Sequence, residues 1–351
     1  MGRQAKGLAV LVGGCVLLAL AACGGPDSSS VKSSPQCDAV GADDGPGAGS
    51  AASHGQPRRS DGEVVVSQQN GQFRATRLVS IANDFGGAAQ AQVDLSSMNG
   101  NVSACVRQGG GYRINVTLEA RAPTEQAARD ALDTMVVNHG DALAAGALAL
   151  NTRVDFATGG AGSGITIAGI DLGGASGDVQ RGAHIAAGLP AGASYRFNHM
   201  TSNGDVEDSG FSGAAAKLSS SNGSVALDGR WDTASLDTSN GVVAVSGDYA
   251  ALDASTTNGV IGAALATQRS LSATLSSSNG LVDVMLQPSG AGFDLQAGTT
   301  NGQASIDVPG TDPVGPQTGT SAHRRTPDYS SRSVQVQVNA SSSNGNASIH
   351  Q

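Results

Sequence analysis

The chain has 351 residues and a formal net charge of −9, and only 3% of its residues are aromatic. Such a chain lacks the basic patches and stacking rings that nucleic-acid binding requires, so we expect no nucleic-acid partner. The same acidity argues against electrostatic adsorption to anionic lipid.

Residues 1–22 have the features of a secretory signal peptide. Arg3 and Lys6 form a positive start, and an apolar run from Gly7 to Ala22 follows. A charged start, a short apolar run and small residues before the cut are typical of export. An ordinary signal peptide or a membrane span are the alternatives, although the run is shorter than the roughly 20 residues of a span.

The signal ends in Leu-Ala-Ala and is followed by Cys23. This ending resembles the lipobox of bacterial lipoproteins, which implies that Cys23 is lipid-modified and is the first residue of the mature chain. The resemblance implies a lipid-anchored protein of the bacterial cell envelope, in the periplasm or at the cell surface. Its membrane contact is then the N-terminal lipid.

Residues 23–60 are rich in Gly, Pro, Ser and Asp and read as a flexible linker behind the anchor. Cys15 leaves with the signal and Cys23 takes the lipid, so Cys37 and Cys105 remain. In an oxidising compartment these two cysteines can form a disulfide, with two free thiols as the alternative.

Residues 61–194 form an N-terminal β region with one helix, at about 123–138. The helix is predicted from apolar residues at helical spacing after Pro123. They are Ala127, Ala128, Ala131, Leu132, Met135 and Val136. Short apolar runs such as Ile165–Ile170 indicate irregular strands before the repeats begin.

Residues 195–351 contain the Asn-Gly pair seven times. The pairs begin at Asn203, Asn222, Asn240, Asn258, Asn279, Asn301 and Asn344. A period near 20 residues is the signature of a repeat architecture, in which no unit buries its apolar face alone.

The residues around each Asn alternate between apolar and polar. Counting from Asn as zero, positions −6, −4, +3 and +5 are mostly apolar, and position −2 is always Ser or Thr. A period of two predicts strands, so each repeat is a strand, an Asn-Gly corner and a second strand. The same frame fits Asn99-Gly100 and, with Gln68 at position −2, Asn70-Gly71.

Two all-β architectures keep this alternation. One is a β-solenoid of stacked coils, and the other is an antiparallel meander of hairpins with Asn-Gly turns. The solenoid is favoured because so many strands exceed the usual limit of one open sheet, and the repeats offer no helix to cover an apolar face. Small interior residues and few aromatic ones also suit thin coils.

Residues 309–333 interrupt the repeats as a loop insertion about one coil long, which accounts for the 43-residue spacing between Asn301 and Asn344. The insertion is rich in Pro, Gly, Ser and Thr and carries His323, Arg324 and Arg325. Insertions in solenoids often lie on a binding face, and a disordered loop is the alternative.

Together, the N-terminal strands, the short helix and the repeated Thr/Ser-Ser/Thr-Asn-Gly-x-Val/Ile coils resemble the bacterial putative adhesin family. The resemblance covers residues 61–351, and 195–308 most specifically. It implies an envelope-associated β-repeat domain of unknown function and no established catalytic residues. His199 and Asp208 depart from the pattern because they occupy slots that are elsewhere apolar.

We predict no catalytic, cofactor or metal site. His199 is expected to be half-exposed on the first coil, and the acidic residues Asp205, Glu207 and Asp208 to form a solvated turn. The other histidines lie too far apart in sequence for zinc spacing. They are His54, His139, His184, His323 and His350. The glycines of 159–164 lack a following helix signal, which argues against phosphate binding.

Every repeat has a Ser or Thr at position −2, and none of these residues has a partner His. We therefore interpret them as hydrogen-bonding ladders between coils and not as nucleophiles. Three hypotheses for function remain. The first is an adhesin-like binding or scaffold module for an envelope macromolecule or polysaccharide, and the second is a structural, self-associating element. The third, a β-helix polysaccharide enzyme, is disfavoured because Asp237, Asp253 and Asp283 occupy different slots.

Replacing Cys23 with Ser tests the anchor. Because only a thiol can take the lipid, the variant should move from the membrane pellet to the soluble fraction on ultracentrifugation. Cys15→Ser, which leaves the lipobox intact, is the matched control and should stay in the pellet. A Cys23→Ser protein that still sediments with membranes would refute lipidation at this residue.

Overall fold

The computed structural model describes residues 54–156 and 179–351, which form two compact units. The N-terminal unit comprises the described residues up to Thr238, and the C-terminal unit is Ser239–Gln351. The signal peptide, Cys23 and the segments 159–164 and 165–170 lie outside the described residues. No helix within the described ranges has both the length and the apolar character needed to cross a membrane.

The C-terminal unit is a stack of β-coils. Its strands are β13 (Val243–Asn258), β14 (Ile261–Leu265), β15 (Leu271–Asn279), β16 (Val282–Leu286), β17 (Gly292–Asn301), β18 (Ala304–Asp307), β19 (Asp312–Pro313), β20 (Ser321–Arg325), β21 (Gln335–Asn344) and β22 (Ala347–His350). Successive coils pair in parallel, so that Asn258 lies opposite Asn279. A hairpin meander would require antiparallel neighbours across each corner, so the predicted β-solenoid is confirmed.

Apolar side chains of each coil point into a thin interior. On the coil of β15 and β16, Ala273, Leu275, Val282 and Val284 are each at most 2% exposed. Burying an aliphatic side chain of this size stabilises the fold by roughly 1.5–3 kcal/mol for Val or Leu. The slots that the alternation marks as apolar are therefore the core of the stack.

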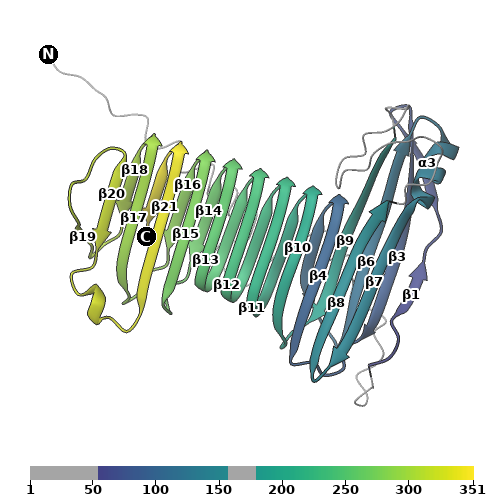
Figure 1. The fold of residues 1–351 in the computed structure, drawn as a ribbon, viewed down its shortest axis with the longest axis horizontal. Helices are drawn as coiled ribbons and strands as arrows, with labels where there is room; N and C mark the ends of the chain where they lie inside the picture. The colour runs from purple at the N-terminus through teal and green to yellow at the C-terminus, as the bar shows by residue number, and fades with distance from the viewer. Residues whose placement is uncertain (1–53, 157–178) are drawn as a thin grey trace. The chain divides into compact units, whose positions relative to one another are not determined.

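The last coil of the chain lies out of sequence order. Strand β21 pairs in parallel with β15 on one side and with β17 on the other, and β22 lies between β16 and β18. Figure 1 shows the yellow β21 between these two earlier strands. The 43-residue spacing therefore arises because the chain passes the end of the stack and returns to fill a place between two earlier coils.

Residues 309–333 are not a disordered loop. They contain β19, β20 and a short 3-10 helix, Tyr329–Ser331. Strand β20 pairs antiparallel with β17 on the side away from β21. The insertion therefore covers the edge of the terminal coil, which would otherwise expose unpaired backbone groups.

The N-terminal unit combines coils with antiparallel strands. Its elements are β1 (Arg58–Asp61), β2 (Val65–Gln69), β3 (Gln72–Asp84), β4 (Gln90–Asn99), β5 (Val102–Arg107), β6 (Gly111–Ala122), α3 (Glu125–Asp133), β7 (Met135–Ala144), β8 (Ala147–Phe156), β9 (Gln180–Pro190), β10 (Ser194–Asn203), β11 (Val206–Asn222) and β12 (Val225–Asn240), whose last two residues belong to the C-terminal unit. Strand β1 thus begins inside the segment that the sequence assigns to the linker.

Coil order departs from sequence order in this unit as well. Strand β4 pairs in parallel with β8 and with β10, and β5 pairs in parallel with β9 and with β11. Figure 1 shows β4 between β8 and β10. The coil around Asn99 therefore stacks directly on the coil around Asn203, as the shared slot pattern of the two corners indicates.

Antiparallel strands and one helix close the other end of this unit. Strand β7 pairs with β8, and β6 joins β9 to β3. The helix α3 begins after Thr124, whose side chain accepts a hydrogen bond from Ala127 N, and it buries Ala128 and Leu132. It ends at Asp133, earlier than the predicted 138, because Met135 already belongs to β7.

The Asn70-Gly71 pair is a hairpin turn and not a coil corner. Strands β2 and β3 pair antiparallel across it, and φ is 53° at Asn70 and 78° at Gly71. Positive φ at both central residues is the mark of a type I′ turn. This is the pair in which Gln68 replaces the Ser or Thr at position −2, so the exception to the motif marks the exception to the fold.

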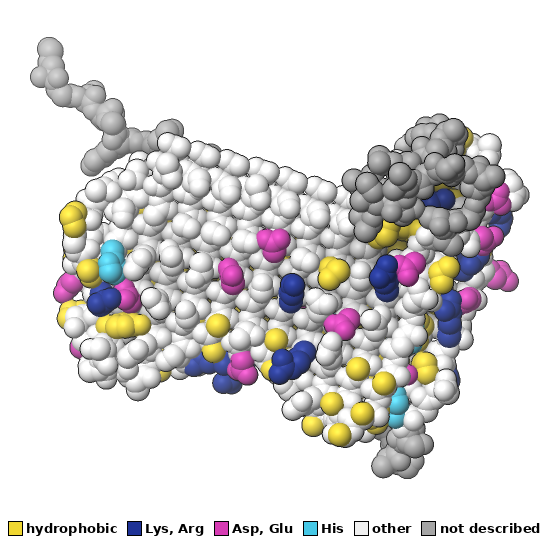
Figure 2. All heavy atoms as spheres, in the orientation of Figure 1, with side chains coloured by type: hydrophobic (Ala, Val, Ile, Leu, Met, Phe, Trp, Pro, Cys, Tyr) yellow, Lys and Arg dark blue, Asp and Glu magenta, His cyan; other side chains and the backbone are white. Residues whose placement is uncertain are grey.

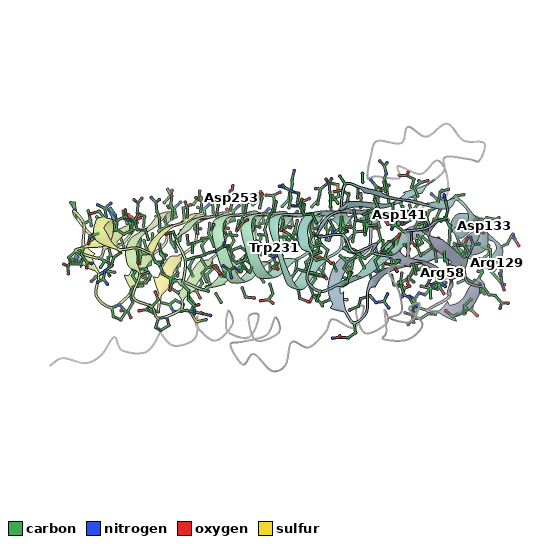
Figure 3. The ribbon with its side chains drawn as sticks, turned by 90° about the horizontal axis from the view of Figure 1, so that it is seen from below. Arg58, Arg129, Asp133, Asp141, Trp231 and Asp253 are labelled. Atoms are coloured by element: carbon green, nitrogen blue, oxygen red, sulfur yellow. The ribbon has the colours of Figure 1, made fainter. Side chains whose placement is uncertain are left out.

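The interior of the N-terminal unit is not built from small residues alone. Five aromatic side chains, Phe85, Tyr195, Phe197, Phe211 and Trp231, form one cluster with ring centroids 5.0–6.2 Å apart. Figure 3 shows Trp231 between the strand layers. Five of the eleven aromatic residues of the chain thus pack together in this unit, where their large side chains fill the interior.

Three features of the repeated corner lock neighbouring coils together. First, the hydroxyl at position −2 donates to a glycine carbonyl of the next coil, as Ser342 does to Gly280 O at 2.7 Å and Thr299 to Gly345 O at 2.7 Å. The hydroxyls therefore act as the predicted ladder. The glycine carbonyl at the corner thus accepts a hydrogen bond from a side chain in place of one from a backbone N–H group.

Second, the corner asparagines hydrogen-bond to one another through their side-chain amides. The Nδ2 group of Asn279 donates to Oδ1 of Asn258 at 2.9 Å, and that of Asn344 donates to Oδ1 of Asn279 at 2.8 Å. Asn301 in turn donates to Asn344 at 2.9 Å. In the N-terminal unit the same ladder joins Asn222, Asn203 and Asn99.

Third, the glycine leaves room for the neighbouring backbone. A Cβ atom at Gly259 would lie 1.7 Å from the carbonyl oxygen of Gly241, and one at Gly280 would lie 1.7 Å from that of Gly259. No side chain fits at such a separation, so the corner glycine is required by the close approach of coils.

Gly259→Ala should therefore strongly destabilise the stack, because the new methyl group must push two coils apart along their whole paired length. We expect a loss of about 3 kcal/mol or more of unfolding free energy, measured by urea titration. Gly298→Ala is the matched control, since its added Cβ would meet no atom within 4 Å. Equal stability of the two variants would contradict the corner geometry.

Candidate functional site

The most extensive surface feature of the C-terminal unit is a regular array of hydroxyl and amide side chains, which we name the hydroxyl face. It lies on the outer side of β13, β15, β21 and β17. Its members are Ser255, Thr257, Thr274, Ser276, Ser278, Gln296, Thr300, Asn339, Ser341 and Ser343. Each alternates with a buried slot on its strand, so the pattern that builds the core also builds this face.

The strand register arranges the hydroxyl face in rows. Ser255, Ser276 and Ser341 occupy matching positions on adjacent strands, and Thr257, Ser278 and Ser343 form the next row toward the corner. Adjacent strands lie about 4.8 Å apart, so like hydroxyls repeat at that interval. Backbone pairing on both sides of β15 and β21 fixes these positions before any ligand arrives.

The hydroxyl face carries little charge. Asp253 projects outward from β13 beside it, as Figure 3 shows. Figure 2 shows the same part of the unit as a mostly white expanse of uncharged polar side chains and backbone, with only scattered acidic and basic groups. Serine and threonine hydroxyls both donate and accept hydrogen bonds, so the face offers recognition without a net field.

Several polar clusters in the described residues could in principle support chemistry, and the first is His199 with Asp208. His199 Nδ1 lies 2.8 Å from Asp208 Oδ2, and both side chains are fully buried. The ring of His199 stacks on Phe197 at 4.7 Å between centroids. A substrate cannot reach this pair, so it is a core element and not a catalytic one.

This burial corrects two sequence predictions. His199 is 0% exposed and not half-exposed, and Asp208 is 1% exposed and not part of a solvated turn. Asp205 is exposed, as predicted, and Glu207 is half-buried. Burial and then the neighbouring charges of Asp208 and Asp205 raise the pKa of Glu207. Both side chains can be buried at these inward positions because each supplies the hydrogen-bonding partner that the other needs.

A second cluster lies where β6, β7 and the first described residues meet. The Tyr112 hydroxyl donates to Asp141 Oδ2 at 2.5 Å and lies 3.0 Å from His139 Nε2. His139 Nδ1 is 2.9 Å from the Thr152 hydroxyl, and His54 Nε2 is 3.3 Å from Asp141. Four of these residues thus form one hydrogen-bonded chain, and His54 contacts its Asp141 as an ion pair.

This chain of groups is poorly suited to catalysis. Burial, followed by the hydrogen bond to Asp141, raises the pKa of Tyr112, so its phenol stays protonated. Burial lowers the pKa of His139 against the opposing charge of Asp141. Thr152 is 0% exposed. Its hydroxyl cannot act on a substrate, and the cluster instead fastens His54 to the unit.

A third cluster brings Asp283, Ser348 and His350 together on β16 and β22. Ser348 Oγ donates to Asp283, and His350 Nε2 lies 3.4 Å from the same carboxylate. The hydrogen bond to Asp283 raises the pKa of His350 above its ordinary value. In a Ser-His-Asp triad the imidazole lies between the other two groups. Here the carboxylate does, so the serine is not activated.

A fourth cluster fastens β20 to β17. Asp294 Oδ2 accepts from Arg325 at 2.5 Å, and Asp294 Oδ1 lies 2.7 Å from His323 Nε2. Burial alone would raise the pKa of Asp294, but the hydrogen bonds from Arg325 and His323 outweigh it and lower that pKa. Two residues of the predicted loop insertion thus attach it to the terminal coil.

The remaining predicted sites are placed as follows. Cys23 and Cys37 lie outside the described residues. Cys105, on β5, is disulfide-bonded, and its pairing with Cys37 stays a prediction. Among the residues that the structure describes, no three His, Cys, Asp or Glu side chains are arranged to hold a metal ion.

Sequence reasoning located the coil corners but not these clusters. The members of the Tyr112 cluster come from β6, β7, β8 and the start of the unit, and no local spacing connects them. The one available signal was the polar substitution at two apolar slots, His199 and Asp208, which lie on the same coil. Two coincident exceptions within one coil point to a compensating pair.

Stacked coils with an Asn-Gly corner and an outward face of small polar residues define this chain as a β-solenoid module. The family model Toastrack DUF4097 matches residues 163–350, more than half of the chain. The chain therefore belongs to the Toastrack family. No curated protein matches its sequence.

Two solved structures resemble the chain at low identity. A putative cell adhesion protein from Clostridium sporogenes is 10% identical with a TM-score of 0.32, and the match covers 84% of this chain and 100% of that one. A putative adhesin from Bacteroides fragilis is 11% identical with a TM-score of 0.32, with 78% and 96% covered.

The buried pair of His199 and Asp208 gives a stability prediction. His199→Leu alone should cost about 3–5 kcal/mol, because it leaves Asp208 buried without its partner. The double variant His199→Leu, Asp208→Leu should recover most of this loss, since Leu218 and Leu227 fill the same slots on the next coil. Urea unfolding of the wild type and both variants measures this, and a double variant no more stable than His199→Leu would count against the pairing.

Proposed function

We propose that this chain is a non-catalytic, lipid-anchored module of the bacterial cell envelope that binds a neutral, hydroxyl-rich polymer, such as an envelope polysaccharide, through its hydroxyl face. The anchor is Cys23, and the linker that follows it gives the module its reach. In this respect the module acts like an adhesin or a scaffold.

The row arrangement of the hydroxyl face carries this proposal. A polymer of repeating units presents its hydroxyl groups at regular intervals, and a row such as Ser255, Ser276 and Ser341 can form hydrogen bonds with them at several successive units. Each contact is weak on its own, but many contacts along one ligand add up. Because the strands are already ordered, little conformational entropy is lost on binding.

The charge of the face narrows the class of ligand. Asp253 lies in the row of Thr274 and Asn339. At the β17 edge of the face, Arg325 and His323 are paired with Asp294, so their charge is locally compensated. A strongly anionic polymer would require arginine or lysine partners, and a cationic one would require several carboxylates. A neutral polymer matches the donors and acceptors that this surface offers.

The polar clusters support a non-catalytic module. The pair of His199 and Asp208 is closed to solvent, and the phenol of Tyr112 is committed to Asp141. In the cluster of Asp283 the carboxylate separates the serine from the histidine. Each of these groups interacts with a partner inside the fold, whereas a catalytic group would need to face a substrate.

The test is a pair of lysine substitutions on the face. Thr274→Lys together with Ser278→Lys places two long charged side chains across the rows of β15, and we expect at least a tenfold loss of binding. The probes are an immobilised neutral glucan, a polyuronate and a sulfated glycan, compared by surface plasmon resonance. The neutral glucan should bind best to the unmodified protein.

The matched control is Gln303→Lys, just before β18, with Ser305→Lys on β18, where both side chains are exposed. It adds the same charge and should leave binding unchanged. Melting curves of both variants should overlap that of the wild type. Equal binding by the two lysine variants would show that the hydroxyl face is not the binding surface.

A further inference from the structure

The place of the C-terminal coil in the stack has a consequence for assembly. Residues of β21 and β22 are paired on both sides, with β15 and β16 forming one wall and β17 and β18 forming the other. We name the space between these walls the coil slot. The coil that fills it is the last in the sequence, whereas both walls are formed by earlier residues.

Contacts in the coil slot come from the repeated motif. Asn344 donates to Asn279 and accepts from Asn301, and the Ser342 hydroxyl donates to Gly280 O. Inside the stack, Val338 and Ala340 are at most 1% exposed between the same slots of β15 and β17. These groups recognise the shape of a coil, and they would bond in the same way to an identical coil from another chain.

Strands β19 and β20, which we name the cap, are fastened to the wall formed by β17. Strand β20 pairs with β17, and Asp294 of β17 binds both Arg325 and His323. Past the cap, Thr326 N still bonds to Phe293 O at 2.9 Å. The C-terminal coil can therefore leave the slot by bending the short segment between Tyr329 and Val334 while the cap stays in place.

The walls can also exist without the inserted coil. Leu275 of β15 and Ala297 of β17 occupy the same slot of the motif, and both strands end in Asn-Gly, at Asn279 and Asn301. Each therefore offers the edge that the other requires. Direct pairing of the two walls is therefore an alternative to insertion of the coil.

We propose that the coil slot is an interaction site for the C-terminal coil of a second copy of this chain. Two or more copies exchange Gln335–His350, and each slot is filled by a neighbour. The exchanged state has the same contacts in every slot as the single chain. The balance between them is set by strain in the 329–334 segment and by protein concentration. The lipid anchor proposed above would raise that concentration by confining copies to one surface.

Mixed disulfides between two variants, each with one introduced cysteine, test the exchange. Ser278 on β15 and Ser343 on β21 are exposed neighbours, because Ser277 lies opposite Ser342 and Asn279 opposite Asn344. Parallel strands place such Cα atoms about 4.8 Å apart, within the range that a disulfide spans. Full-length Ser278→Cys and Ser343→Cys proteins, each also carrying Cys23→Ser, are mixed at high concentration under mild oxidation.

Exchange predicts a covalent dimer that contains one copy of each variant, seen on non-reducing gels and identified by mass spectrometry. The mismatched control is Ser278→Cys mixed with Gln337→Cys, because Gln337 pairs with Ser272 and lies far from Ser278. The matched mixture should give at least ten times as much covalent dimer as this control. A single chain with both Ser278→Cys and Ser343→Cys, oxidised at low protein concentration, should form the bond internally and then yield no dimer.

The internal bond of the double variant is also the reference for a negative result. If it forms while the mixed single variants give no more dimer than the mismatched pair, the coil does not exchange and the proposal is overturned. This outcome leaves the hydroxyl face untouched, because binding of the neutral glucan is measured separately on the unmodified chain.

Discussion

Close contact between coils at the Asn-Gly corner is the constraint on which the rest of this structure depends. Two backbones approach so closely that a Cβ atom at Gly259 would lie 1.7 Å from a neighbouring carbonyl oxygen. The missing side chain permits this approach, the hydroxyl at position −2 satisfies the carbonyl, and the asparagine amides join coil to coil. The corner thus sets the parallel register, and the register aligns apolar slots inside and hydroxyl rows outside.

This origin of the surface explains the kind of function that the module can have. A face produced by repetition offers the same group many times, which suits a repeating ligand better than a single small molecule. Catalysis needs the opposite arrangement, in which a few different groups converge on one point. Where different groups do converge, as at Asp141 and Asp294, they fasten an end of a unit to its stack. The architecture is therefore suited to binding and scaffolding, the functions proposed above.

In both units one coil is placed between two others out of sequence order, β4 with β5 in one and β21 with β22 in the other. Such insertion pairs residues far apart in the chain, which raises the loop-closure entropy lost before the contacts form. The order of the stack in the C-terminal unit therefore depends on residues that follow both walls in the sequence. The same feature makes the C-terminal coil the element that another copy could supply.

The sequence by itself determined the coil. Alternation at period two determined which residues point inward, Asn-Gly preceded by Ser or Thr at position −2 marked the coil corners, and Pro123 marked where the helix begins. The hydroxyl face could be predicted from the same alternation. Only the tertiary structure decided the order of coils, the end of the helix at Asp133, the shared burial of His199 with Asp208, and the Tyr112 cluster. The physical reason is that periodicity acts within one coil, whereas each coil edge can pair with several equivalent edges, and the choice among them depends on how the entire chain packs.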